Sequence, residues 1–250
     1  RIAAAGLIPL SGIEASLSAI AAAASIHPAH HVPVIAAPNV TGATILDEAA
    51  SKALLRPYGL DLPKNLVVKR QALPETLPFG YPVVLKAMGQ AHKSEMDGVK
   101  LGLADRAELE AAMAKMDQPV YLIEEMVGDG LIELLVGVVA DPTHGYLLTL
   151  AAGGVLTEIL KDNVSLSLPV EEADILTALE KLRIAPLLAG YRGKPAADKA
   201  ALVTAVLAVQ ECVLDNRARF SEIELNPLIL TATRAVAVDA LIKTGEKSHG

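Results

Sequence analysis

The strongest constraint on the fold is a series of short apolar segments that follow one another through the middle of the chain. Runs rich in valine, leucine and isoleucine, bounded by glycine, proline or aspartate, are typical of β-strands. The segment 141–145, Asp-Pro-Thr-His-Gly, fits a hairpin turn between two of them. Turns this short argue against a doubly wound parallel sheet. The strands expected in this series are 120–126, 131–140, 146–151 and 155–160.

Helices and further strands flank this series. Helical spacing up to a stop at Gly59 predicts a first helix, opened by a capping box of Thr44 and Asp47. The mixture of helices with strands joined by short turns predicts an α+β fold. The other helices are expected at 105–116, 171–184 and 198–214, and the other strands at 66–69, 81–86, 99–103, 221–230 and 235–241.

The composition limits the class of protein and partner. With 250 residues, 52% hydrophobic and 20% charged, the chain can form one large domain or two small ones. A net charge of −7 gives no general attraction for nucleic acid or for an anionic membrane. Cys212 is the only cysteine, which excludes an internal disulfide and a multi-cysteine metal site. No apolar run reaches the roughly 20 residues of a membrane span. The single cysteine fits a reducing compartment, so we expect a cytoplasmic protein.

The first 26 residues resemble a secretory signal only superficially. Pro9 and Gly12 interrupt the apolar run, and the spacing of Ile13 and Leu17 predicts an amphipathic helix instead. The proline-dense stretch 27–43 favours extended structure, and its histidines are expected to be solvated rather than bound to metal. Because the chain starts without methionine, we expect an N-terminal truncation.

Lys86 is the first candidate for chemistry, because it ends an otherwise apolar strand. An ammonium in that position needs an anionic partner, although a lysine that reaches the surface would fit the same pattern. The loop 91–98 that follows contains His92 and could carry phosphate, as could many polar surface loops.

A second candidate is the strand that ends at Val127 before Gly128-Asp129-Gly130. Backbone groups exposed after a strand can read an adenine edge, and a carboxylate such as Glu133 can accept hydrogen bonds from ribose hydroxyls. A plain hairpin with solvated acids is the alternative.

The sharpest pattern lies near the C-terminus. The period of a strand places Glu222, Glu224 and Asn226 on one face, and Asp239 stands within a wholly apolar strand. Asn226 and Asp239 could hold Mg²⁺ across a hairpin, because Mg²⁺ prefers oxygen ligands. Alternatively, Asp239 could be bonded to backbone amides.

Taken together, several segments resemble one family in content and order. It is the ATP-grasp domain of NDP-forming acyl-CoA synthetases, relatives of succinyl-CoA synthetase. The resemblance implies an ATP-grasp fold over 44–243, in which two α+β subdomains grip the nucleotide. It also implies that 1–36 is the tail of a CoA-ligase-like subdomain, 37–43 a linker and 244–250 a C-terminal tail. The segments that carry it include Tyr81-Pro-Val-Val-Leu-Lys86, His92-Lys93-Ser94, Glu124-Glu125-Met126-Val127, Gly153-Gly154, Leu188-Ala-Gly-Tyr-Arg-Gly193 and Glu224-Leu-Asn-Pro-Leu228.

The resemblance also implies roles for single residues, with ATP and Mg²⁺ as cofactors. Lys86 would contact nucleotide phosphates, and Glu133 would bind the ribose. The adenine would be read by the main chain at Glu124, Met126 and Val127. The Mg²⁺ ligands would be Asn226 and Asp239, while Glu224 and His92 would act in phosphoryl transfer, Glu224 by meeting a phosphohistidine and His92 as a second phosphoryl carrier. Asp97 departs from the family, which usually has glycine there, and this weakens the role of His92 most.

The implied reaction is acid + CoA + ATP ⇌ acyl-CoA + ADP + phosphate, through an acyl phosphate and a phosphohistidine. The partners would be CoA-binding and phosphohistidine-bearing domains of the same or another chain, with CoA and a small carboxylic acid as substrates. A homo-oligomer is left open. We expect the polypeptide alone to bind ATP weakly and to make no acyl-CoA. The alternative is a nucleotide-binding regulatory module of a synthetase-like region fused to a protein acetyltransferase.

Overall fold

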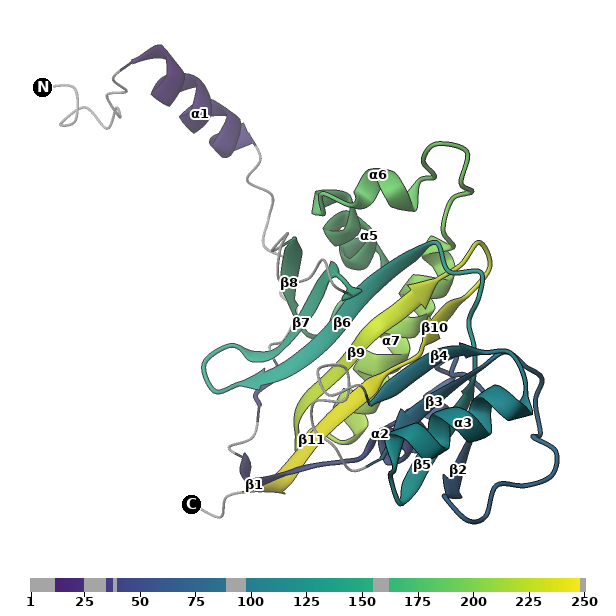
Figure 1. Cartoon of the computed structure of the whole chain (residues 1–250). Coiled ribbons are helices and arrows are strands. Elements are labelled where there is room, and N and C mark those ends of the chain that lie inside the picture. Colours follow the sequence, from purple (N-terminus) through teal and green to yellow (C-terminus); the bar gives the residue numbers. More distant parts are fainter. Residues whose placement is uncertain (1–11, 25–34, 38–39, 89–97, 155–161, 248–250) are drawn as a thin grey trace, which may run out of the picture. The chain divides into compact units, whose positions relative to one another are not determined.

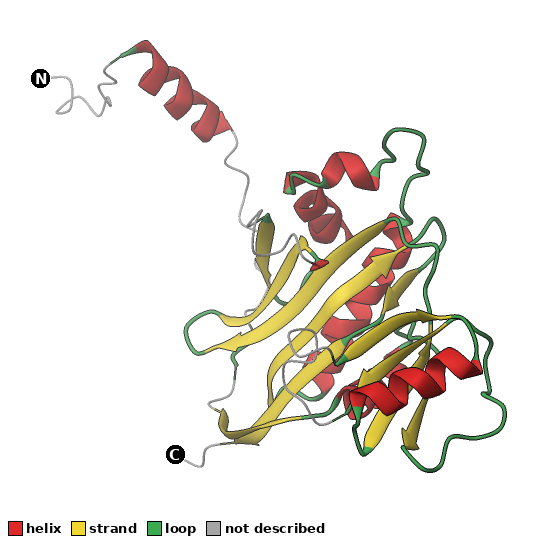
Figure 2. Cartoon of the chain, in the orientation of Figure 1, coloured by secondary structure: helices red, strands yellow, loops and turns green. Residues whose placement is uncertain are grey.

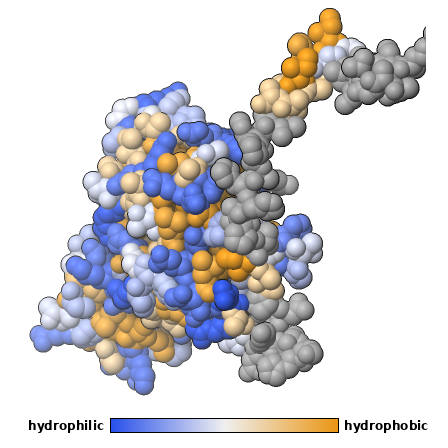
Figure 3. All heavy atoms as spheres, turned by 180° about the vertical axis from the view of Figure 1, so that it is seen from behind, coloured by the Kyte–Doolittle hydropathy of each residue, from blue (hydrophilic) through white to orange (hydrophobic). Residues whose placement is uncertain are grey.

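The computed structural model describes residues 12–24, 35–37, 40–88, 98–154 and 162–247. The chain divides into two units, Arg1–Pro33 and Val34–Gly250. In the first unit, helix α1 (Ile13–Ala24) confirms the predicted helix, and its apolar residues are exposed and coloured orange in Figure 3. No helix in the described part of the chain is both long and apolar enough to cross a bilayer.

The second unit contains two antiparallel sheets (Figure 1). The larger sheet has, in spatial order, β1 (Val40–Ile45), β11 (Ala240–Lys247), β9 (Phe220–Leu230), β6 (Ile132–Asp141), β7 (Gly145–Ala152) and β8 (Asn163–Ser167), with β10 (Ala235–Ala237) paired to β9. The smaller sheet has the order β2 (Asn65–Lys69), β5 (Val120–Glu125), β3 (Val83–Ala87) and β4 (Val99–Leu103).

Helices cover each sheet (Figure 2). In the second unit these are α2 (Glu48–Leu55), the short 3₁₀ helix η2 (Arg56–Tyr58), α3 (Arg106–Met116), α5 (Glu172–Lys181), α6 (Ala185–Leu188) and α7 (Lys199–Asp215). Helix α7 packs on β9 and β10 of the larger sheet, and α3 packs on β3 and β4 of the smaller one. The predicted α+β class is confirmed.

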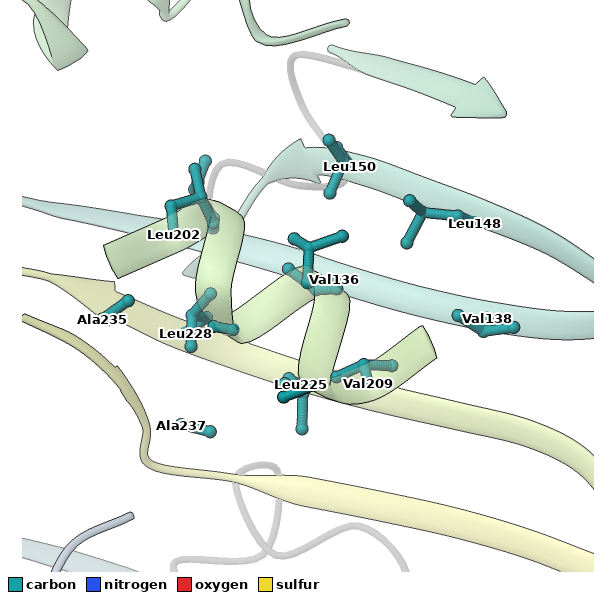
Figure 4. Close-up of a cluster of buried hydrophobic side chains, with 14 of the residues drawn as sticks. Val136, Val138, Leu148, Leu150, Leu202, Val209, Leu225, Leu228, Ala235 and Ala237 are labelled. Carbon is teal, nitrogen blue, oxygen red and sulfur yellow. The ribbon is translucent and has the colours of Figure 1, made fainter. Parts of the chain in front are cut away.

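The core of the larger sheet follows from the two-residue period of its strands (Figure 4). Val136 on β6 and Leu225 on β9 point to the face where α7 presents Leu202 and Val209, and all four are buried. Each such side chain contributes about 1.5–3 kcal/mol when it is removed from water. This packing fixes which face of β9 is left for polar residues.

The smaller sheet has its own core beneath α3. Leu85 and Ile123 are fully buried against Leu109 of the helix. Tyr121 is also fully buried, and its hydroxyl donates to the Met113 carbonyl at 2.6 Å, so the polar tip is satisfied. The strands of this sheet are therefore held as a separate layer.

Most of the predicted elements are confirmed. Helix α3 begins after Asp105, whose side chain accepts the Glu108 N–H at 2.9 Å. Helix α7 begins after Asp198, which accepts the Ala201 N–H at 2.9 Å. The hairpin turn between β6 and β7 lies at the predicted place.

Three predictions at element ends are wrong. Asp47 alone caps α2, by accepting the Ala50 N–H, because Thr44 lies in β1. The helix predicted over 171–184 ends at Lys181, and α6 follows. The single strand predicted over 235–241 is interrupted between β10 and β11.

Other differences concern segments that the prediction left out or assigned otherwise. Strand β8 was not predicted, and the strand expected at 155–160 lies outside the described residues. Strand β1 pairs with β11 as far as Lys247. Parts of the expected linker 37–43 and tail 244–250 therefore pair as strands, while the domain boundaries stay predictions.

Substitution of two leucines on adjacent strands tests which side chains of the smaller sheet are buried. Leu85 on β3 is fully buried, whereas Leu101 on β4 is 67% exposed. We expect Leu85→Ala to lower the free energy of unfolding by about 2–5 kcal/mol, because it opens a cavity. The control Leu101→Ala should change it by about 0.5 kcal/mol or less. Equal losses in urea unfolding would contradict the assigned packing.

Candidate functional site

The candidate site lies where the last strands of the larger sheet are interrupted. Strand β9 pairs with β10 on one side of the interruption and with β11 on the other, in one register. That register sets Asn226 opposite Asp239. Between the two strands, the Val238 N–H donates to the Pro227 carbonyl at 3.2 Å. The two predicted metal ligands are thus cross-strand neighbours.

Asn226 is oriented by two hydrogen bonds. Its Nδ2 donates to Glu224 Oε1 at 3.2 Å, and its Oδ1 accepts a long bond of 3.4 Å from the Gly154 N–H. Glu224 and Asn226 are half-buried, whereas Ile223 and Leu225 are buried on the opposite face. The predicted alternation along this strand is confirmed, and the amide oxygen of Asn226 faces the loop after β7.

Glu133, the predicted ribose acid, approaches that same loop. Its carbonyl accepts the Gly153 N–H at 2.9 Å. A Cβ at Gly153 would lie 2.6 Å from the Leu134 backbone carbon, and a Cβ at Gly154 would collide with Glu133 Oε2. Gly154 also has a φ of +64°, which favours glycine. The two glycines therefore let the backbone pass between Glu133 and Asn226.

A cluster of four buried charges lies at Val238, the residue before Asp239. We call Glu48, Lys52, Lys86 and Glu124 the charge cluster. Lys86 Nζ contacts Glu48 Oε1 at 2.5 Å and Glu124 Oε2 at 2.9 Å. Lys52 Nζ contacts Glu48 Oε1 at 2.8 Å and Glu124 Oε1 at 2.6 Å. Each carboxylate thus bridges both ammonium groups.

The two ammonium groups also share a backbone acceptor. The Val238 carbonyl accepts from Lys86 Nζ at 2.6 Å and from Lys52 Nζ at 2.7 Å. Val238 is the residue before Asp239, in the interruption of the larger sheet. The cluster therefore joins α2, the smaller sheet and the larger sheet at one point, and it brings Lys86 to the metal-ligand candidates.

The pKa values of the two lysines move in opposite directions. Burial lowers the pKa of Lys52, and the nearby Lys86 charge lowers it further, against the effect of Glu48 and Glu124. Burial also acts to lower the pKa of Lys86, but Glu48, Glu124 and Asp239 outweigh it, so this pKa lies above its usual value. The closeness of Asp239 to Lys86 accounts for part of the difference. Lys86 is therefore a cation at neutral pH.

The predicted adenine hinge lies at the end of β5. The Glu124 side chain is directed into the charge cluster, and its backbone pairs with Asn65 and Val84. The Met126 N–H donates to the Pro82 carbonyl at 3.2 Å. Val127 is the next residue, half-buried and outside the sheet. The backbone of Glu124 and the N–H of Met126 thus have hydrogen-bonding partners at the smaller sheet, whereas Val127 follows beyond them.

Sequence reasoning missed two residues of the site. Glu48 and Lys52 stand four residues apart on α2, a spacing usual for a solvated pair on a helix surface. The spacing of Leu55 could have indicated their burial. Leu55 follows Lys52 by three residues, so it lies on the same face of the helix, and it is fully buried. Conversely, His92 lies within 89–97, outside the described residues.

The oxygen ligands available for a metal ion are few. In the described residues, no group of three or more His, Cys, Asp or Glu side chains could enclose an ion. The pair of Asn226 and Asp239 offers an amide oxygen and a carboxylate. Mg²⁺ in proteins is commonly held by one or two such groups, with phosphate oxygens and water completing its shell. The pair fits that pattern and does not fit a closed structural metal site.

Comparison with known proteins gives a consistent result. The model of the ATP-grasp domain family matches residues 39–244. The chain is 33% identical over 218 residues to the beta subunit of an ADP-forming acetate–CoA ligase II of Pyrococcus furiosus, covering 80% of this chain and 92% of that subunit. It is also 33% identical over 214 residues to a trans-feruloyl-CoA synthase of an unknown prokaryotic organism, covering 79% of this chain and 30% of that protein.

A similar solved structure is the dinucleotide-forming acetyl-coenzyme A synthetase 1 of Candidatus Korarchaeum cryptofilum, in complex with coenzyme A and Mg-AMPPCP. It is 27% identical with a TM-score of 0.66, and the match covers 78% of this chain and 90% of that chain. The chain thus spans most of a separate subunit but about a third of the longer trans-feruloyl-CoA synthase.

Gly153 provides a test of the geometry of the site. Gly153→Ala should lower the free energy of unfolding by about 1–3 kcal/mol, because its Cβ meets backbone that cannot move aside. Gly128→Ala is the control, since nothing lies within 4 Å of its Cβ position. It should change stability by about 1 kcal/mol or less. If denaturant unfolding shows both variants equally stable, the close approach of Gly153 to β6 is wrong.

Proposed function

The chain belongs to the ATP-grasp domain family, and on this premise we propose that it binds Mg·ATP as the nucleotide-binding part of an ADP-forming acyl-CoA synthetase. The recognised family and the ATP-grasp fold agree with the expectation from the sequence. The comparisons offer no support for the alternative, a regulatory module fused to an acetyltransferase.

One observation carries the proposal. The Lys86 ammonium lies 2.6 Å from the Val238 carbonyl, at the interruption that sets Asn226 opposite Asp239. A cation from one sheet and two oxygen-bearing side chains from the other are therefore available for a nucleotide with its Mg²⁺. Phosphoryl transfer needs mainly positioning and charge neutralisation of the phosphates, and this set of groups is suited to both.

Each residue has a proposed role in holding the nucleotide. Asn226 Oδ1 and the Asp239 carboxylate would hold Mg²⁺, which supplies charge neutralisation at the phosphates when it is bound. Lys86 would contact a phosphate oxygen. Met126 and Val127 follow β5 and would read the adenine through the main chain, and Glu133, beside Gly154, would accept from the ribose.

Residues around this set have proposed roles in the later steps. Glu224 would meet a phosphohistidine, and it also orients the Asn226 amide through its 3.2 Å hydrogen bond. His92 would act as a second phosphoryl carrier. CoA-binding and phosphohistidine-bearing domains, in the same or a partner chain, would complete the reaction acid + CoA + ATP ⇌ acyl-CoA + ADP + phosphate. The relatives are named for acetate and trans-ferulate, so we propose a carboxylic acid without choosing its size.

We also propose that the protein acts in the cytoplasm. Its single cysteine, Cys212, is buried, and burial raises its pKa to about 12, so the thiol is inert. Cysteine usage of this kind suits a reducing compartment.

Binding of Mg·ATP to the wild-type chain is the first test. A ligand at 100 times its Kd should raise the free energy of unfolding by about 2.7 kcal/mol. Asp239→Asn should remove most of this increase, because it removes a charge at the metal and phosphate position. Asp215→Asn, at the exposed C-terminal end of α7, is the control and should keep it. Thermal melts with Mg·ATP, ATP alone and Mg²⁺ alone measure the effect.

Two outcomes would contradict the proposal. Either the wild-type chain shows no stabilisation by Mg·ATP, or Asp239→Asn is stabilised as much as Asp215→Asn.

A further inference from the structure

Lys52 has no role in the nucleotide site proposed above, yet it is the most deeply buried charge near it. Its side chain is 0% exposed, and that of Lys86 is 7% exposed. The two ammonium groups contact the same three partners, which are Glu48, Glu124 and the Val238 carbonyl. One buried lysine could be paired by these groups alone, so the presence of a second lysine needs an explanation.

The contacts favour the charged form of both lysines. Every partner of Lys52 and Lys86 is a carboxylate or carbonyl oxygen, which accepts hydrogen bonds. Lys52 donates hydrogen bonds to all three oxygens, whereas a neutral amine has only two N–H donors. Lys86 donates two hydrogen bonds and contacts Glu124 Oε2 at 2.9 Å. Among these four side chains, two ammonium groups are therefore paired with two carboxylates.

This balance conflicts with the proposed role of Lys86. A contact with a phosphate oxygen would compete with the contacts that Lys86 makes within the protein, which are two hydrogen bonds and the ion pair with Glu124. When Lys86 turns away, Glu48 and Glu124 lose part of their neutralising charge. Breaking a buried ion pair in this way is strongly unfavourable if nothing else neutralises the charge that remains.

We infer that Lys52 is a positioning residue that keeps Glu48 and Glu124 neutralised while Lys86 moves from the charge cluster to a nucleotide phosphate. Lys52 is suited to stay, because its side chain is completely buried and comes from α2, whereas the Lys86 side chain comes from β3 and is 7% exposed. With Lys52 in place, one ammonium group still contacts both carboxylates after Lys86 has turned away. This role rests on the proposed function, since it concerns the same nucleotide site.

A purely structural role for Lys52 would give a different result in nucleotide binding. If Lys52 only joined α2 to the two sheets, its loss would reduce stability, and the removal of Glu48's charge would not restore nucleotide binding. If Lys52 neutralises the carboxylates, removal of one carboxylate charge should make Lys52 less necessary. The two explanations are therefore separated by a double variant.

The test measures the Kd for Mg·ATP by calorimetry in the full chain. We expect Lys52→Met to raise the Kd about tenfold, equivalent to about 1.4 kcal/mol. The double variant Glu48→Gln with Lys52→Met should recover most of that loss, and Glu48→Gln alone should bind more tightly than the wild type. Lys69→Met, at an exposed position of β2, is the matched control and should leave the Kd unchanged.

The outcomes separate this inference from the proposed function. If the wild-type chain does not bind Mg·ATP, the proposed function fails, and the role of Lys52 fails with it. If the wild type binds, two results overturn the role of Lys52 while the proposed function stands. One is that Lys52→Met has the same Kd as the wild type, and the other is that it has the same Kd as the double variant. If Lys52→Met does not fold, Glu48→Gln decides, because weaker binding in that variant would overturn the inference.

Discussion

The site depends on the pairing of two ammonium groups with two carboxylates inside the protein. The carboxylate of Glu124 comes from the smaller sheet and that of Glu48 from α2, and both ammonium groups reach the Val238 carbonyl of the larger sheet. An unpaired charge at this depth would be costly, so the three layers are held at fixed positions. The same contacts bring Lys86 to the interruption that contains Asp239.

That interruption has a second consequence for the larger sheet. At the interruption Val238 faces Pro227, which accepts the Val238 N–H but has no N–H of its own to donate in return. The Val238 carbonyl is therefore available to Lys52 and Lys86, while the register on each side still sets Asn226 opposite Asp239. Packing of α7 on the far face keeps β9 in place, so the polar face stays directed to the site.

Local patterns predicted much of this. The two-residue period along β9 was enough to place Glu224 and Asn226 on one face, because alternation depends only on neighbouring residues. The charge cluster was not predicted, because Lys52 and Glu124 are 72 residues apart and meet only through the packing of α2 on both sheets. The interruption at Val238 was missed for a similar reason. An apolar run such as 235–241 predicts a strand, and only the partner strand shows where its pairing changes.

The central claim is that Lys86 exchanges contacts within the charge cluster for a phosphate while Lys52 stays. A crystal structure of the chain with Mg²⁺ and a non-hydrolysable ATP analogue measures this directly. We predict the Lys86 ammonium at about 3 Å from a phosphate oxygen, with Lys52 still bound to Glu48 and Glu124. A nucleotide bound elsewhere, with Lys86 still held by both carboxylates and the Val238 carbonyl, would contradict the account.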